Sequence, residues 1–205
     1  MKHLALFESF EITEPIKDGE PLNNREINIL LGHNVVCPEL ILKDDNYYYV
    51  FDHRCEYIKD LPVTYIHGLC SKFDIKNYKI NDDLSIDVDY VSFYKTSLSK
   101  IPLVFNIVRG SFYCYINKLT TLEGSPKYVG GDFNCHSNQL TTLKGSPKIV
   151  GGHFDCRFNK LTTLEGSPES VGGYFDCRSN RLTTLEGSPE SIGRGIYYSN
   201  NKLPT

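Results

Sequence analysis

Hydrophobic positions in the second half of the chain recur at a fixed spacing. The segment NKLTTLEGSPKYVGGDFNCHS (117–137) is followed by three segments of the same length and pattern, at 138–158, 159–179 and 180–200. In the first three segments a Phe and a Cys alternate with polar residues, and Ile196 and Tyr198 take these positions in the fourth. This alternation is the period of a short strand with one buried face. The pattern therefore predicts a stack of short parallel strands, one in every 21-residue repeat. We call each repeat a rung.

The period also continues towards the N-terminus. LSKIPLVFNIVRGSFYCYI (98–116) keeps the Leu, the Gly, the Phe and the Cys, and YVSFYKTSL (90–98) aligns Val91 with Phe112. The sequence therefore predicts a solenoid of about six rungs over residues 86–205. A few residues depart from the pattern in the outer rungs, where solenoids are usually atypical: Thr96, Arg109, Arg194 and Tyr198.

Each repeated position has a physical role in this interpretation. The side-chain amide of Asn138 and its equivalents can hydrogen-bond exposed backbone in the turn. Leu119 and Leu122, with their equivalents, fill the core behind the sheet. Pro126 and its equivalents favour an extended or polyproline-like return on the convex side. The Gly pairs permit a tight corner before the strand.

The stretch FDCRSNRLTTL (175–185) resembles the core of leucine-rich repeats, in which alternating apolar residues precede an Asn and a returning Leu. The short period and the LTTLEGSP segment resemble the compact repeats of secreted bacterial effectors. The Gly-Gly-x-Phe-x-Cys motif resembles that of leucine-rich repeat proteins encoded by large tailed phages. The resemblance implies a mainly β leucine-rich repeat solenoid with parallel strands on a concave face. It implies almost nothing about function.

Residues 1–85 lack the repeat. The segments 25–32, 37–42, 46–52 and 61–69 are short, rich in β-branched or aromatic residues, and bounded by turn formers, so we expect strands. KINDDLSIDVDYVSF (79–93) then alternates towards the first rung. We expect a β-rich N-terminal cap that shields the solenoid, with a separate functional domain as the alternative. The spacing of His33, His53 and His67 resembles no metal motif.

Composition narrows the class of partner. The chain has 205 residues, 40% hydrophobic and 23% charged, and a formal net charge of −3. This is an ordinary globular balance that calls for neither nucleic acid nor an anionic membrane. No apolar run approaches a membrane span, and the start is a poor signal peptide because Glu8 interrupts a short apolar stretch. We expect a cytoplasmic protein without cofactors, in a host cytoplasm if it is phage-encoded.

Cys135 and His136 stand side by side and could be read as a nucleophile with its base, or as metal ligands. Neighbours on a strand point to opposite faces, so we expect Cys135 in the core and His136 outside. The next rungs keep the Cys but replace the His with Arg157 and Arg178. A disulfide ladder is also disfavoured, because stacked parallel Cβ atoms lie about 4.8 Å apart. We therefore expect reduced, buried thiols.

The outward positions form three columns across the rungs. The flanking column is Tyr90, Ser111, Asp132, His153, Tyr174, Gly195. The middle column is Ser92, Tyr113, Asn134, Asp155, Asp176, Tyr197, and the end column is Tyr94, Tyr115, His136, Arg157, Arg178, Ser199. Tyr and Arg are enriched in binding hot spots. We expect a protein-binding face formed by Tyr94, Tyr113, Tyr115, His136, Asp155, Arg157, Tyr174, Asp176 and Arg178, with a solvated face that binds nothing as the alternative.

Asp155 and Asp176 could be mistaken for an acid/base pair. We expect Arg157 and Arg178 to neutralise them across the diagonal, and we expect no catalytic or metal site. An enzyme with its site in residues 1–85 is a weaker alternative, since no phosphate-binding Gly loop or recognisable triad occurs.

Two further features suggest a structural or packaged virion component as the alternative function. Leu6-Phe7-Glu8 and Ile12-Thr13-Glu14 resemble the cleavage signal of capsid-maturation proteases of large tailed phages, although such tripeptides are common by chance. The last strand, 195–198, is expected to leave an open edge near Ile196 and Tyr198 that could pair with a second copy, giving a homodimer, or with a partner strand.

Overall fold

The computed structural model describes residues 40–43, 46–51, 54–57 and 61–204. It divides into two compact units, Met1–Leu69 and Cys70–Thr205, and each is treated by itself. The described part of the first unit contains a three-stranded antiparallel sheet of β1 (Leu40–Lys43), β2 (Asn46–Phe51) and β3 (Arg54–Tyr57). The expected strands at 37–42 and 46–52 therefore overlap β1 and β2. The expected strand at 25–32 lies outside the described residues.

The prediction of a strand at 61–69 is wrong. These residues belong to helix α3 (Leu61–Lys72), which spans the division between the two units. The β-branched and aromatic content suggested a strand, but the buried residues Ile66, Leu69 and Cys70 recur at the spacing of a helix face. Pro62 also suits the first turn of a helix, because its missing N–H has no intrahelical acceptor there.

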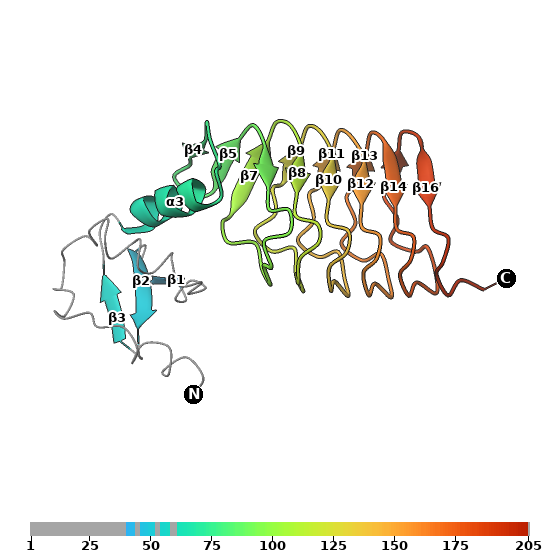
Figure 1. Ribbon diagram of the computed structural model, residues 1–205, viewed down its shortest axis with the longest axis horizontal. Helices are drawn as coiled ribbons and strands as arrows, with labels where there is room; N and C mark the ends of the chain where they lie inside the picture. Colours follow the sequence, from blue (N-terminus) through green and yellow to red (C-terminus); the bar gives the residue numbers. More distant parts are fainter. Residues whose placement is uncertain (1–39, 44–45, 52–53, 58–60, 205) are drawn as a thin grey trace. The chain divides into compact units, whose positions relative to one another are not determined.

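The second unit is a parallel β-solenoid (Figure 1). Its first sheet has six parallel strands, one per rung: β6 (Val91–Ser92), β8 (Phe112–Tyr113), β10 (Phe133–Asn134), β12 (Phe154–Asp155), β14 (Tyr174–Asp176) and β16 (Gly195–Tyr197). Partner residues such as Phe133 and Phe154 lie 21 positions apart, which confirms the period and the mainly β class.

A second sheet lies in the return segments, where the sequence predicted only extended chain. It has seven strands: β4 (Lys79–Ile80), β5 (Ile86–Val88), β7 (Phe105–Val108), β9 (Tyr128–Val129), β11 (Ile149–Val150), β13 (Ser170–Val171) and β15 (Ser191–Ile192). β4 pairs antiparallel with β5, and the other pairs are parallel. Each rung after the first thus supplies one short strand to each sheet.

The core lies between the two sheets and repeats with the rungs. Phe112, Phe133, Phe154 and Phe175 stack at centroid separations of 5.2–5.4 Å with nearly parallel rings, and all are fully buried. Phe73 meets Phe93 edge to face at 5.0 Å at the start of the second unit. The Leu pairs of the repeat, from Leu119 and Leu122 onward, fill the space behind the strands. Burial of these residues is the main stabilising term, because each removes a large apolar surface from water.

An asparagine ladder connects the rungs. The Asn159 amide nitrogen donates to the carbonyls of Cys135 and Cys156, at 3.1 Å each, and its Oδ1 accepts the N–H of Leu140 at 3.0 Å. Asn117, Asn138, Asn180 and Asn201 repeat these contacts. The expected role of this position is confirmed, since each amide satisfies backbone groups of its own rung and the preceding one.

The Gly pair is required by the closeness of the rungs. A Cβ placed on Gly151 would lie 2.3 Å from the carbonyl oxygen of Gly130 in the preceding rung. The constraint at this corner is therefore steric, because both residues have ordinary backbone angles. The chain can therefore turn from β11 into β12 at Gly151 and Gly152 without pushing the rungs apart.

Candidate binding face

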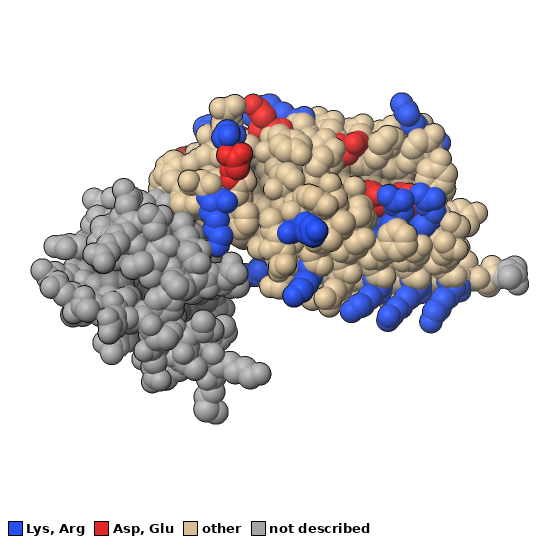
Figure 2. Space-filling model, viewed as in Figure 1, with Lys and Arg blue, Asp and Glu red and all other residues tan. Residues whose placement is uncertain are grey.

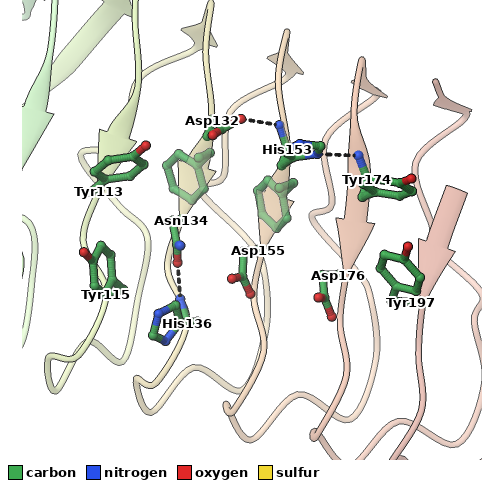
Figure 3. A pocket seen from close by; sticks show the side chains of 12 residues that line it. Tyr113, Tyr115, Asp132, Asn134, His136, His153, Asp155, Tyr174, Asp176 and Tyr197 are labelled. Atoms are coloured by element: carbon green, nitrogen blue, oxygen red, sulfur yellow. Dashed lines mark hydrogen bonds between the residues drawn. The ribbon is translucent and has the colours of Figure 1, made fainter. Parts of the chain in front are cut away.

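The three outward columns lie on the outer side of the six-stranded sheet, which we call the binding face. A hollow of about 460 Å³ lies at its centre, lined mainly by residues of these columns. Figure 3 shows their side chains projecting from β8, β10, β12, β14 and β16 and from the residues that directly follow or precede these strands. The lining residues are Tyr113, Tyr115, Asp132, Phe133, Asn134, His136, His153, Phe154, Asp155, Tyr174, Asp176 and Tyr197.

Side chains of the flanking column accept the backbone N–H of the equivalent residue in the next rung. Ser111 Oγ accepts the N–H of Asp132 at 3.0 Å, and Asp132 Oδ1 accepts the N–H of His153 at 2.7 Å. His153 Nδ1 accepts the N–H of Tyr174 at 2.8 Å (Figure 3). Three different residue types thus perform one task, which is to satisfy the N–H that follows the Gly pair. Because Nδ1 accepts, the neutral His153 ring carries its proton on Nε2.

Three side chains of the middle column accept a backbone N–H at the ends of β10, β12 and β14. Asn134 Oδ1 accepts the N–H of His136 at 3.1 Å, two residues on in the same rung. Asp155 and Asp176 do the same for Arg157 and Arg178, at 3.1 and 3.2 Å. Short polar side chains commonly accept such local N–H groups where the chain turns away from a strand. The middle-column carboxylates therefore have a structural task before any binding role.

Both carboxylates are also paired with guanidinium groups. Arg157 binds Asp155 with two hydrogen bonds, Nε to Oδ1 at 3.0 Å and Nη2 to Oδ2 at 2.8 Å. Arg178 binds Asp176 in the same way, with Nη2 to Oδ2 at 2.6 Å. The expected diagonal contact exists between Arg157 Nε and Asp176 Oδ2 at 3.3 Å, but the principal pairing runs within each rung. The carboxylate side chains are only 14% and 12% exposed, so the arginines neutralise partly buried charge.

Aromatic rings stack along the columns in two groups. In the end column, Tyr94, Tyr115 and His136 stack at 4.8 and 4.7 Å. In the second group, His153 of the flanking column stacks on Tyr174 at 5.3 Å, and Tyr174 lies 5.0 Å from Tyr197 of the middle column. The rings contact each other within each group, either stacked or tilted. The hollow lies between these two groups.

The electrostatic surroundings of His136 lower its pKa below the ordinary value of 6.5. The largest cause is partial burial, which disfavours the charged ring, and the nearby Arg157 acts in the same direction, while Asp155 opposes both. His136 is therefore mainly neutral near pH 7 and contributes a polar ring with little charge to the hollow. Its Nδ1 lies 2.9 Å from Ser137 Oγ.

The thiols lie on the opposite side of the strands. Cys114, Cys135, Cys156 and Cys177 are buried and unpaired, as expected. Burial raises the pKa of Cys135 and Cys156 well above the usual range for a thiol, and raises that of Cys177 to about 12. Cys135 and His136 point to opposite faces, which confirms that they form no dyad. The described residues contain no group of three His, Cys, Asp or Glu side chains placed to hold a metal ion.

The structure brings most of the sequence-predicted face residues together. Tyr113, Tyr115, His136, Asp155, Tyr174 and Asp176 line the hollow. Tyr94 stacks beyond one end of it, and Arg157 and Arg178 hold its carboxylates. The prediction omitted four other lining residues from the columns, Asp132, Asn134, His153 and Tyr197. Strand parity places all four on the outward face, so the register of the columns is the signal that could have found them.

The two residues expected at an oligomerisation edge lie in and beside β16. Ile196 pairs with Phe175 of β14 and is half-buried, whereas Tyr198 is 45% exposed. Among the described strands, β16 pairs only with β14.

The fold places the second unit in the class of parallel β-solenoid repeat proteins. Comparison with known protein families, with curated proteins and with solved structures gave no match. In the described part of the chain, no helix has the length and apolar character needed to cross a bilayer.

Proposed function

We propose that this protein is a non-catalytic binding module that recognises a protein partner through the binding face. The observation that carries the proposal is the hollow between two groups of contacting aromatic rings. Tyrosine supplies large contact area and a hydrogen-bonding group at a low cost in conformational entropy. Six rungs at about 4.8 Å span roughly 24 Å, enough for a modest protein epitope.

The absence of catalysis is part of the proposal. Asp155 and Asp176 are engaged by local N–H groups and by arginine, so neither is free to act as a general acid or base. Asp132 and His153 accept backbone N–H groups. A rigid polar surface of this kind can present fixed donors and acceptors to a partner, which favours recognition over chemistry.

The test uses substitutions that the fold itself offers. Tyr113→Asn copies Asn134 of the same column, and Tyr115→Ser copies Ser199, so both variants are expected to fold. In a pull-down from host lysate, the double variant should lose captured proteins that wild type retains. Lys127→Glu, on an exposed position beside the second sheet, is the control and should capture the same proteins. Equal capture by all three proteins contradicts the proposal.

Arg157 and Arg178 are poor choices for this test. Charge reversal at these two positions would leave two partly buried carboxylates without their partners. The variant would then lose stability, and a loss of binding could not be assigned to the contact itself.

A second candidate function is assembly as a structural or virion component of a phage, through the edge of β16. It is favoured by the pairing of β16 with β14 alone among the described strands, since an unpaired strand edge is a template for another strand. Light scattering over a concentration series distinguishes it from the first candidate. Mass growth that disappears in Ile196→Lys supports assembly, and a constant monomer mass rejects self-assembly.

A further inference from the structure

A row of basic side chains runs along one edge of the solenoid, distinct from the binding face, and within it Lys160 Nζ donates a hydrogen bond to Gln139 Oε1 at 3.4 Å. It occupies the position after the ladder asparagine, filled by Lys118, Gln139, Lys160, Arg181 and Lys202. All five residues are exposed. Figure 2 shows basic side chains gathered along the lower edge of the second unit. We call the four cations of this position the basic ridge.

The backbone holds the ridge in register. The N–H of Lys160 donates to the carbonyl of Leu140, that of Arg181 to Leu161, and that of Lys202 to Leu182, each at 2.8 Å. The α-carbons therefore repeat at the rung spacing of about 4.8 Å, and Lys118 to Lys202 spans about 19 Å.

The ridge cations have no acidic partner among the described residues. The ion pairs of the repeats use other positions, such as Lys144 with Glu165 at 2.9 Å and Lys148 with Glu169 at 3.2 Å. A row of four like charges repels itself, so the fold gains nothing from it. An anionic partner would relieve this repulsion.

Exposed apolar side chains lie two residues before two of the ridge cations. Ile116 is 41% exposed and Phe158 is 57% exposed, and both have a positive φ, of 55° and 52°. An isoleucine in this backbone region is costly. Ser137 and Ser179 occupy the same position in neighbouring rungs with the same φ, so the described fold itself does not require an apolar residue there. Strained, exposed apolar residues beside a charged row indicate a contact surface.

The spacing of this surface matches one side of an α-helix. A helix lying along the ridge rises about 5.4 Å per turn, close to the rung spacing of about 4.8 Å, so one carboxylate per turn can meet one cation per rung. Over four rungs the mismatch is roughly 2.4 Å, which lysine side chains can absorb. Ile116 and Phe158 are two rungs apart, about 9.6 Å, and residues i and i+7 of a helix are about 10.5 Å apart.

We propose that the basic ridge, with Ile116 and Phe158, docks an acidic amphipathic helix of a protein partner. The helix presents one Glu or Asp per turn to the ridge and apolar residues at i and i+7 to the two exposed side chains. The proposal is independent of the binding face, because no ridge residue lines the hollow. Single-stranded nucleic acid fits less well, since it needs open ring faces for its bases, and Phe158 is the one exposed aromatic ring at this corner position in the described rungs.

The probe is a synthetic helical peptide of about five turns, with Glu once per turn on one side and Leu at i and i+7 beside it. Fluorescence anisotropy at low salt measures its binding. Wild type should bind this peptide at least tenfold more tightly than a peptide of the same composition in scrambled order, because only the ordered peptide aligns its charges with the ridge. Added salt should weaken the binding, because the ridge cations are exposed.

Substitutions that copy other rungs keep the variants folded. Lys160→Gln with Arg181→Gln and Lys202→Gln copies Gln139 and should weaken binding about tenfold, since exposed ion pairs each contribute up to about 1 kcal/mol. Phe158→Ser copies Ser137 and should weaken it severalfold. Gln139→Lys completes the row and should tighten binding. A control with the same charge change, Lys127→Gln with Lys144→Gln and Lys148→Gln, should leave binding unchanged.

Other outcomes overturn the proposal. Equal affinity for the ordered and scrambled peptides, or an unchanged affinity in the triple ridge variant, rejects helix docking. Tighter binding of a thymidine oligonucleotide, of heparin, or of vesicles containing phosphatidylserine than of the peptide identifies a general anion surface instead. Loss of peptide binding in the Tyr113→Asn, Tyr115→Ser variant would place the contact on the binding face and not on the ridge.

Discussion

His153 Nδ1 accepts the backbone N–H of Tyr174 in the next rung at 2.8 Å, in the same way that Asp132 Oδ1 accepts the N–H of His153. The imidazole therefore replaces a carboxylate as a backbone acceptor between adjacent rungs. This relationship shows that variation at Ser111, Asp132 and His153 is constrained, because each of these three side chains accepts one backbone N–H of the next rung.

Substitution of His153 separates its acceptor role from its ring stacking. His153→Phe keeps a ring to stack on Tyr174 but leaves the Tyr174 N–H without its acceptor, so we expect a loss of about 1–2 kcal/mol in the free energy of unfolding. His153→Asn supplies an amide oxygen and should lose less, although it lacks the ring. Urea denaturation measures both. A Phe variant as stable as wild type would show that water satisfies this N–H.

The asparagine ladder should be most important where it is buried. Asn159→Ala removes one acceptor and several donor contacts from a residue that is 8% exposed, and we expect a loss of about 3 kcal/mol or more. Asn201→Ala removes the equivalent contacts at a more exposed position, where water can replace them, and should cost clearly less. Similar losses at the two positions, measured by chemical denaturation, would contradict a burial-dependent role.

The inward cysteines should be unreactive in the folded protein. Burial raises the pKa of Cys135 and Cys156, so little thiolate forms near pH 8, and the reagent cannot reach either sulfur. We expect labelling with a thiol reagent, mapped by mass spectrometry, to occur only as fast as unfolding. Rapid native labelling of either residue would place it on the wrong face.

Cys156→Ser should destabilise the solenoid moderately. The Cys156 Sγ lies 3.4 Å from the carbonyl oxygen of Asp176, so a serine hydroxyl has one acceptor in reach. We therefore expect a loss of about 1–2 kcal/mol, mainly from burial of a more polar group. Cys156→Ala is the control, because it introduces no hydroxyl and leaves only a small cavity.

His136 should titrate below 6.5, since burial and Arg157 both lower its pKa. The unfolded chain then binds more protons than the folded protein between the folded pKa and 6.5. This group's contribution to stability is therefore complete above about pH 6.5 and is lost as the pH falls through that window. NMR titration measures the pKa directly, and Asp155→Asn should lower it further, because Asp155 favours the charged ring.

The matching stability measurement compares wild type with His136→Gln. Wild type should lose more stability than the variant when the pH falls from about 7.5 to about 5.5. Parallel curves for the two proteins would show that His136 has the same pKa in the folded and unfolded chains.

The sequence determined the repeat and the direction of most side chains within it. A 21-residue period with Phe and Cys at alternating positions can bury a continuous core only if the rungs stack in register, so the strands, the buried cysteines and the asparagine ladder followed from spacing alone. The same parity placed His136 opposite Cys135. These features are local and repeat in every rung, which is why a pattern could predict them.

Only the tertiary structure decided the second sheet, helix α3 and the hydrogen-bond partners of the outward side chains. The second sheet depends on how closely the return segments of successive rungs approach one another, which the pattern within one rung does not show. Helix α3 has the β-branched and aromatic composition typical of a strand. Its buried residues Ile66, Leu69 and Cys70, however, follow the spacing of a helix face. The sequence indicated no partner for Asp132 and His153 and only arginine for Asp155. In the structure all three also accept backbone N–H groups that lie within their reach.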